Sequence, residues 1–273
     1  MTSASSRGYA LGASDAERAR LIVQHDIYRG EAASLAEHIG LRPGSHAVDV
    51  GCGPLGVLDL LTELVGSSGR VVGLDSEPRM LDMARTTLAE RSITGVELVC
   101  DDLLDDDLDA ESFDVVHERF LITNLPYPRD VVSSMTRLAK PGGYVALEDI
   151  DCISWTCHPP HPSWGRLSAA LLTAWYAAGL DAYVGRKLPG LLREAGLVDV
   201  GLDAHVNVWR PGDPYQKTLP HFVREFRERI LRLSDLTEQE FDRCLHELEA
   251  HLDQPTTFTL YNTLIQAWGR KPE

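Results

Sequence analysis

Short apolar runs alternate with amphipathic stripes between residues 46 and 150. Apolar residues at helical spacing follow the first apolar run, and the same spacing occurs after Ser76 and over 128–139. Strands that alternate with helices predict βαβ units with right-handed crossovers and a mostly parallel sheet covered by helices on both faces. Ligands of such sheets bind beyond the carboxyl ends of the strands. The predicted strands are HAVDV (46–50), RVVGLD (70–75), VELVC (96–100), FDVVH (113–117) and YVALEDI (144–150).

The segments on either side of this region have a different pattern. Ser14 and Glu17 form an S-x-x-E capping box that predicts a helix start, and apolar spacing up to residue 39 predicts two helices broken near Gly30. After residue 150 the pattern predicts helices at 166–179, 187–195, 215–233 and 237–252, and strands at 197–209 and 257–271.

We find no linker composition and therefore predict a single domain with insertions. It comprises an N-terminal helical cap (1–40), a ligand-binding core (41–152), and a part that completes the sheet (153–273). Helical insertions at 152–184 and 211–255 are expected to form a lid. The helices at 215–252 and at the N-terminus equally suit an oligomer interface.

The net charge of −15 disfavours a nucleic-acid partner, which requires clustered Lys and Arg. Residues 101–118 hold nine acids and no Lys or Arg. The five cysteines include no C-x-x-C pair, so no metal is expected. No run approaches the roughly 20 apolar residues that span a bilayer, and no signal-peptide pattern is seen, so we expect a cytoplasmic protein without a membrane partner.

The stretch DVGCGPLG (49–56) carries Gly51, Gly53 and Gly56 in G-x-G-x-x-G spacing. Such a loop lets a ligand approach the backbone at a helix N-terminus and is typical of dinucleotide sites. Asp49 at the strand end is an unfavourable neighbour for a pyrophosphate. It suits a cationic ligand or an amino group instead, although it could also simply cap the following helix.

Five segments in order resemble the class I S-adenosylmethionine-dependent methyltransferases. The opening YALG (9–12) and GRKLPGLLREAGL (185–197) are similar to bacterial small-molecule members of the group that includes ubiquinone and menaquinone C-methylases. The resemblance implies a Rossmann-like sheet of seven strands and S-adenosylmethionine as cofactor. The five segments are residues 46–56, VVGLDSEPRML (71–81), VELVCDD (96–102), FDVVHER (113–119) and LAKPGGYVALED (138–149).

The resemblance also implies cofactor contacts. Asp49 would hold the methionine moiety, Asp75 the ribose hydroxyls, and Asp102 the adenine amino group, while Asp101 stands where relatives often have glycine. Asp75 could alternatively be a plain turn residue. The implied cofactor-binding residues are Asp49, Gly51, Cys52, Gly53, Asp75, Ser76, Met80, Asp101, Asp102, Leu103, Glu118 and Arg119.

Methyl transfer from a sulfonium mainly requires alignment and exclusion of water, and a general base helps when the nucleophile carries a proton. Candidate bases follow the fourth and fifth strands: His117, Glu118, Asp149, Asp151, His158 and His161. Of these we favour His158 and Asp151 as catalytic residues, and His117 is equally compatible with simple packing. Aromatic residues that we expect to line the acceptor site are Tyr9, Tyr28, Trp155, Trp164 and Tyr183.

These observations predict a methyltransferase that acts on a hydrophobic small molecule of specialised metabolism. Its N-terminal and C-terminal helices also suit assembly with copies of itself. Two alternatives stay open. A methyltransferase-like protein can bind the cofactor without methylating, for example as a cyclase. An NAD-dependent oxidoreductase shares the glycine spacing and the acid about 20 residues further on.

Overall fold

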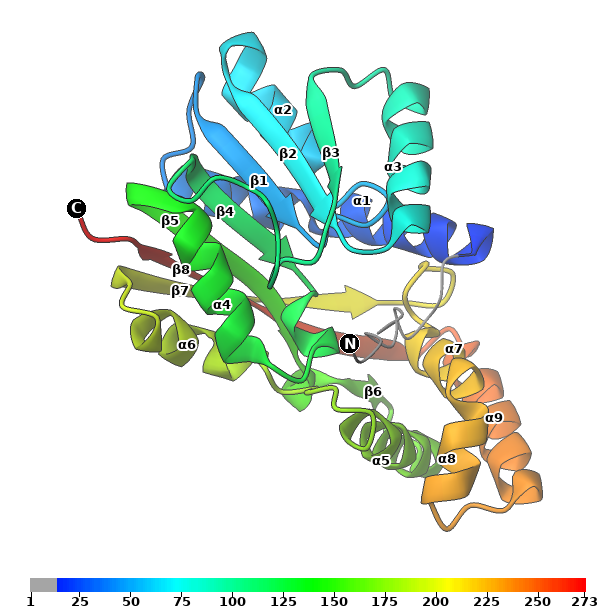
Figure 1. Ribbon diagram of the computed structural model, residues 1–273. Coiled ribbons are helices and arrows are strands. Elements are labelled where there is room, and N and C mark those ends of the chain that lie inside the picture. Colours follow the sequence, from blue (N-terminus) through cyan, green and yellow to red (C-terminus); the bar gives the residue numbers. More distant parts are fainter. Residues whose placement is uncertain (1–13) are drawn as a thin grey trace, which may run out of the picture. The chain divides into compact units, whose positions relative to one another are not determined.

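The computed structural model describes residues 14–273, and within them the chain builds an eight-stranded sheet (Figure 1). Its strands follow the order β3-β2-β1-β4-β5-β8-β6, with β7 also paired to β8. The strands are β1 (His46–Val50), β2 (Arg70–Asp75), β3 (Val96–Cys100), β4 (Phe113–Arg119), β5 (Ala139–Asp151), β6 (Thr156–His158), β7 (Val198–Trp209) and β8 (Phe258–Arg270). The helices are α1 (Asp15–His38), α2 (Leu58–Val65), α3 (Pro78–Glu90), α4 (Pro128–Leu138), α5 (Pro162–Tyr176), α6 (Leu188–Glu194), α7 (Thr218–Glu225), α8 (Arg227–Leu233) and α9 (Glu238–Leu252).

The expected fold class is confirmed. Strands β3, β2, β1, β4 and β5 pair in parallel, whereas β6 pairs with β8 in the antiparallel sense. Successive side chains of a strand alternate between the two faces, so equivalent positions of neighbouring strands form rows. On one face, Ala47, Val71 and Val115 pack with apolar residues of α1 and α2 into a buried core.

Two compact units share the described residues. The first unit contains residues 14–149, 187–203 and 266–273 and carries the parallel strands with helices α1–α4 and α6. The second unit contains residues 150–186 and 204–265 and carries β6 with helices α5 and α7–α9. The two segments that the sequence predicts as lid insertions, 152–184 and 211–255, thus fall together in the second unit.

Three elements differ from the expectation. Gly30 does not break the N-terminal helix: α1 is continuous, begins at the Ser14 cap and buries Ala32 and Leu35 beyond the glycine. The helix expected at 215–233 is divided into α7 and α8 at Phe226. The proline- and tryptophan-rich segment contains β6, which gives the sheet eight strands instead of seven.

Residues 14–273 include no helix with the length and hydropathy that a membrane crossing requires. Within that range no group of three or more His, Cys, Asp or Glu side chains is arranged to hold a metal ion. All five cysteines carry free thiols.

Candidate functional site

The glycine loop joins β1 to α2 in the first unit. Gly51, Gly53 and Gly56 have φ values of +68°, +53° and +50°, a region that side chains with a Cβ rarely adopt. The amides of Gly51 and Cys52 both donate to the Leu74 carbonyl, at 2.7 and 3.1 Å, which anchors the loop to β2. The helix α2 begins at Leu58, two residues after Gly56.

Asp49 lies beneath this loop and is 1% exposed. Its Oδ2 accepts the Val57 amide at 2.9 Å, and its Oδ1 contacts the His117 ring at 2.8 Å. A Cβ built on Gly56 would stand 1.9 Å from the Asp49 Oδ2. Asp49 therefore secures the loop through the amide of Val57, the residue that precedes α2, although α2 has no side-chain cap. Its contact with the methionine moiety stays a prediction.

A row of buried polar side chains extends from Asp49 across the sheet. The His117 ring lies between the Asp49 and Glu148 carboxylates, with both nitrogen–oxygen distances at 2.8 Å. Glu148 in turn accepts the Gln266 side-chain amide at 3.3 Å. Burial alone would lower the pKa of His117, but the two carboxylates raise it to about 9. At neutral pH His117 is thus an imidazolium between two carboxylates and unsuited to accept a proton.

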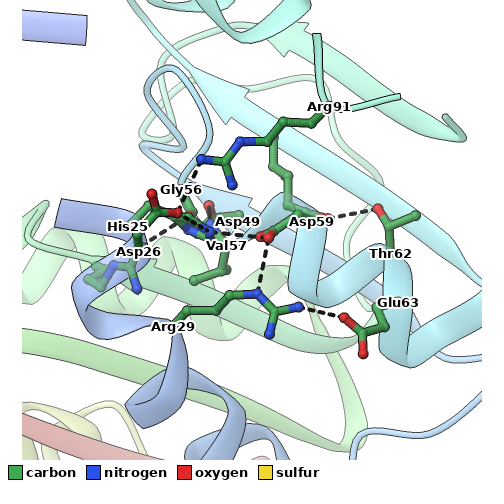
Figure 2. A network of polar contacts seen from close by, with 12 residues as sticks. His25, Asp26, Arg29, Asp49, Gly56, Val57, Asp59, Thr62, Glu63 and Arg91 are labelled. Atoms are coloured by element: carbon green, nitrogen blue, oxygen red, sulfur yellow. Dashed lines mark hydrogen bonds and ion pairs between the residues drawn. The ribbon is translucent and has the colours of Figure 1, made fainter. Parts of the chain in front are cut away.

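The helix α1 holds the same loop from the other side (Figure 2). The His25 Nδ1 donates to the Gly56 carbonyl at 2.7 Å, and its Nε2 faces Asp59 of α2 at 3.1 Å. Burial opposes ionisation of Asp59, but His25 and Arg29 bring the pKa of this carboxyl down to about 2. Arg119, at the end of β4, also donates to the Gly56 carbonyl, at 2.8 Å. Helix α1 and strands β2 and β4 thus all hold the glycine loop in place.

Asp75 ends β2 beside the glycine loop. Its Oδ2 accepts the Gly53 amide and its Oδ1 the Glu77 amide, both at 2.9 Å. The Asp75 carbonyl also accepts the Asp101 amide at 3.3 Å. The ends of β1, β2 and β3 are therefore joined at one edge of the sheet, where the sequence expects the nucleoside.

The remaining residues of this region that the sequence predicts to bind the cofactor differ in solvent exposure. Cys52, Met80 and Leu103 are buried, whereas Ser76 and Asp102 are exposed. Asp101 accepts the Asp102 and Asp107 amides and so shapes the acidic loop after β3. Burial raises the pKa of the Cys52 thiol well above its ordinary value, so this cysteine is not a reactive thiolate.

Glu118 and Asp149 lie near the ends of the neighbouring strands β4 and β5, on the opposite face of the sheet, and both are fully buried. The Glu118 Oε2 accepts the amides of Leu121 and Ile122, at 3.0 and 3.4 Å. Asp149 accepts the Thr123 amide at 2.7 Å. Burial, and secondly the Asp149 charge, raise the pKa of Glu118 well above its usual range. The other Glu118 oxygen, Oε1, is buried without a hydrogen-bond partner.

The two favoured catalytic candidates, Asp151 and His158, lie in the second unit. Asp151 forms a bidentate ion pair with Arg186, at 2.5 and 2.7 Å. Burial would raise the pKa of Asp151, but Arg186 lowers it, which weakens this carboxylate as a base. His158 is exposed and stacks on Phe258, with ring centroids 5.2 Å apart. Their catalytic roles stay predictions.

The expected substrate-lining aromatics fall into different surroundings. Trp155 and Trp164 belong to a buried aromatic cluster of the second unit, with ring centroids 5.8 Å apart. Tyr183 is 37% exposed and lies under the Arg186 guanidinium. Tyr28 is buried against Phe120 in the first unit, and Tyr9 is outside the described residues. The aromatic cluster consists of Trp155, Trp164, Trp175, Phe222, Phe226, Tyr215, Tyr261 and Trp209.

Sequence reasoning did not single out His25, Glu148 or Gln266. For Glu148 a signal existed, because a charged residue inside the apolar run YVALEDI must find a partner when the strand is buried. His25 and Gln266 had no such signal, since each lies in an amphipathic element where a polar residue is ordinary.

The chain matches the family model described as "Methyltransferase domain" over residues 48–147. It is 34% identical over 122 residues to a demethylmenaquinone methyltransferase of Bacillus cereus (strain ATCC 10987 / NRS 248), which covers 45% of this chain and 50% of the relative. The chain spans about half the length of the first curated relatives that it matches.

Solved structures of low sequence identity share the fold. A SAM-dependent methyltransferase from Aquifex aeolicus has a TM-score of 0.52 and 21% identity, with 71% of this chain and 92% of that chain covered. Geranyl diphosphate C-methyltransferase from Streptomyces coelicolor A3(2), solved with Mg²⁺, geranyl diphosphate and S-adenosyl-L-homocysteine, has a TM-score of 0.54 and 17% identity. The match covers 96% of this chain and 87% of that chain.

Proposed function

The chain belongs to the class I S-adenosylmethionine-dependent methyltransferases, and from this premise we propose that it methylates a hydrophobic small molecule. The observation that supports the proposal is the geometry at the edge of the sheet in the first unit, where β1, β2 and β3 end. There a glycine loop, fixed by α1, β2 and β4, adjoins the Asp75 carboxylate. The demethylmenaquinone methyltransferase and the geranyl diphosphate C-methyltransferase are similar proteins whose names refer to small molecules with hydrocarbon chains, which supports this substrate class. A role in specialised metabolism is part of the same proposal.

The cofactor fits the hydrogen-bond acceptors that this edge presents. Asp75 offers two oxygens in one plane, now bonded to the Gly53 and Glu77 amides, which suits a pair of ribose hydroxyls. Asp49 makes the surroundings of the loop unfavourable for a pyrophosphate, whereas an acid at the position of Asp75 is common to both kinds of nucleotide site. S-adenosylmethionine carries no phosphate and supplies an electrophilic methyl group when bound. The protein's own residues then have to orient the two reactants and exclude water.

Calorimetry with three ligands tests the proposal. We expect S-adenosylmethionine and S-adenosylhomocysteine to bind, and NAD(H) to give no measurable heat of binding. Incubation of the protein with methyl-labelled cofactor and an extract of the host organism should move label into an organic-soluble small molecule. Binding of NAD(H) alone would instead favour the oxidoreductase alternative. Label that appears only in protein or RNA would contradict the substrate class.

Replacement of Asp75 by Ala should weaken the binding of S-adenosylhomocysteine about tenfold or more, because a hydrogen bond to a charged group contributes about 1.5–3 kcal/mol. The matched control is Asp82→Ala, which removes an exposed carboxylate of α3 that pairs only with Arg85 in the described structure. Titration calorimetry gives both dissociation constants. Equal affinities for the two variants would show that Asp75 does not contact the nucleoside.

A further inference from the structure

Arg119, the last residue of β4, carries a guanidinium group with one nitrogen that no group in the structure satisfies. Its Nη2 donates to the Gly56 carbonyl at 2.8 Å, whereas its Nη1 is buried and has no hydrogen-bond partner. The Gly56 carbonyl also accepts a hydrogen bond from the His25 Nδ1 at 2.7 Å, so both lone pairs of this oxygen are occupied. Nη1 therefore needs an acceptor other than the loop carbonyl.

The charged groups around Arg119 do not supply that acceptor. Within residues 14–273 its guanidinium forms no ion pair. The register of β4 and β5 places Arg119 opposite Glu148; burial raises the pKa of this carboxyl, but His117 and secondly Arg119 lower it. The two Glu148 oxygens, however, are bonded to His117 and Gln266. A buried N–H of an arginine without an acceptor destabilises the protein, and a bound ligand that supplies the acceptor removes this cost.

The unsatisfied nitrogen belongs to a side chain that is attached to the glycine loop. Arg119 is bonded to the Gly56 carbonyl, and the Asp49 Oδ2 is 1.9 Å from the place where a Cβ of Gly56 would stand. A cation and an anion thus adjoin the same residue of the loop. An α-amino acid carries its ammonium and its carboxylate on one carbon atom, so a neighbouring acid and base match its two charges. The resemblance places the methionine end of the cofactor at Asp49.

From this arrangement we propose that Arg119 binds the α-carboxylate of S-adenosylmethionine through Nη1. The inference rests on the proposed function, and it names the group that Arg119 contacts, which the resemblance does not. The carboxylate is the only anionic group of the cofactor, and a hydrogen bond between a guanidinium and a carboxylate is stronger than one between neutral groups. Nη2 keeps its bond to Gly56, so one side chain holds both the loop and the ligand.

A comparison of two ligands tests the contact. S-adenosylhomocysteine carries the carboxylate, whereas its decarboxylated analogue, S-adenosyl-3-thiopropylamine, has the same thioether and amino group without it. We expect the wild-type protein to bind S-adenosylhomocysteine at least about tenfold more tightly than the analogue, because the analogue leaves Nη1 without an acceptor. Titration calorimetry at neutral pH gives both dissociation constants.

Arg119→Gln is the decisive variant, because it removes the guanidinium. Loss of the bond to Gly56 weakens both ligands alike, so the readout is the ratio of their dissociation constants. We expect the preference for S-adenosylhomocysteine to shrink to less than about threefold. Arg119→Lys keeps the charge but not the paired N–H groups, and it should give an intermediate preference. Arg85→Gln, which removes an exposed guanidinium of α3 that pairs with Asp82, should keep the wild-type ratio.

Two results would contradict the inference and leave the proposed function standing. The first is equal affinity of the wild-type protein for the two ligands, which would mean that no group binds the carboxylate. The second is a wild-type ratio that persists in Arg119→Gln or in Arg119→Lys, which would mean that Arg119 only supports the loop. Failure of the wild-type protein to bind S-adenosylmethionine and S-adenosylhomocysteine would overturn the proposed function, and the role of Arg119 with it.

Discussion

Replacement of Gly56 by Ala is expected to unfold the glycine loop and to abolish cofactor binding. The added Cβ would stand 1.9 Å from the Asp49 Oδ2 and 2.9 Å from the Cys52 carbonyl oxygen. Asp49 can yield only by leaving the Val57 amide and His117, which are its two partners. Loss of these contacts inside the core should lower the free energy of unfolding by at least about 3 kcal/mol, the range of overpacking combined with a broken buried ion pair.

Gly53→Ala is the matched control for this variant. Gly53 has nearly the same φ, +53° against +50°, but a Cβ at this position meets no atom within 4 Å. Its cost is the strain of the left-handed conformation alone, about 1–2 kcal/mol. Urea unfolding of the ligand-free variants separates the two effects. Equal losses of stability would show that backbone conformation, and not the space occupied by Asp49, decides the need for glycine at position 56.

The comparison of these two glycines explains what the sequence could predict about the site. The G-x-G-x-x-G spacing and the strand ends predicted a ligand-binding loop at the right edge of the sheet, because strand and helix periods are local properties. They did not show that Gly56 makes room for Asp49, since that depends on how the loop closes over β1. Both oxygens of Asp49 have partners that lie 8 and 68 residues away.

The same distinction between local and distant contacts explains the fold. The first four predicted strands were located almost to the residue, because each is a short apolar run bounded by turn residues. The break expected at Gly30 was wrong, because burial of Ala32 and Leu35 outweighs the roughly 1 kcal/mol helix penalty of a glycine. Strand β6 was missed because its three residues, between a tryptophan and a proline, are too few to show an alternation of apolar and polar side chains.

The row of polar residues across the sheet is a harder case. Its members come from β1, β4, β5 and β8, and only the strand register brings Asp49 opposite His117. Without the register between β1 and β4, the sequence leaves His117 equally compatible with a general base and with a packed side chain. The structure favours a third role, because the ring is the central cation between two carboxylates.

That role predicts a specific dependence of stability on pH. The pKa of His117 is about 9 in the folded protein against 6.5 for a free histidine side chain, so between these values the folded state binds a proton that the unfolded state has lost. The stabilisation is fully present below pH 6.5 and disappears as the pH rises through about 9. It amounts to about 3 kcal/mol, since each unit of pKa difference corresponds to about 1.4 kcal/mol. Urea unfolding at a series of pH values measures this decline.

His117→Gln should remove the decline together with most of the stabilisation, because it leaves Asp49 and Glu148 buried without a cation between them. Loss of one partner of a buried ion pair costs about 3–5 kcal/mol. His38→Gln, which changes an exposed ring that is hydrogen-bonded to the Ser34 carbonyl and lies against Trp268, should keep the wild-type decline. If the wild-type protein is equally stable at the two ends of this pH range, His117 is neutral in the folded state. The row would then be a chain of hydrogen bonds around an uncharged ring, and Asp49 would need a different cation, such as the cofactor's own amino group.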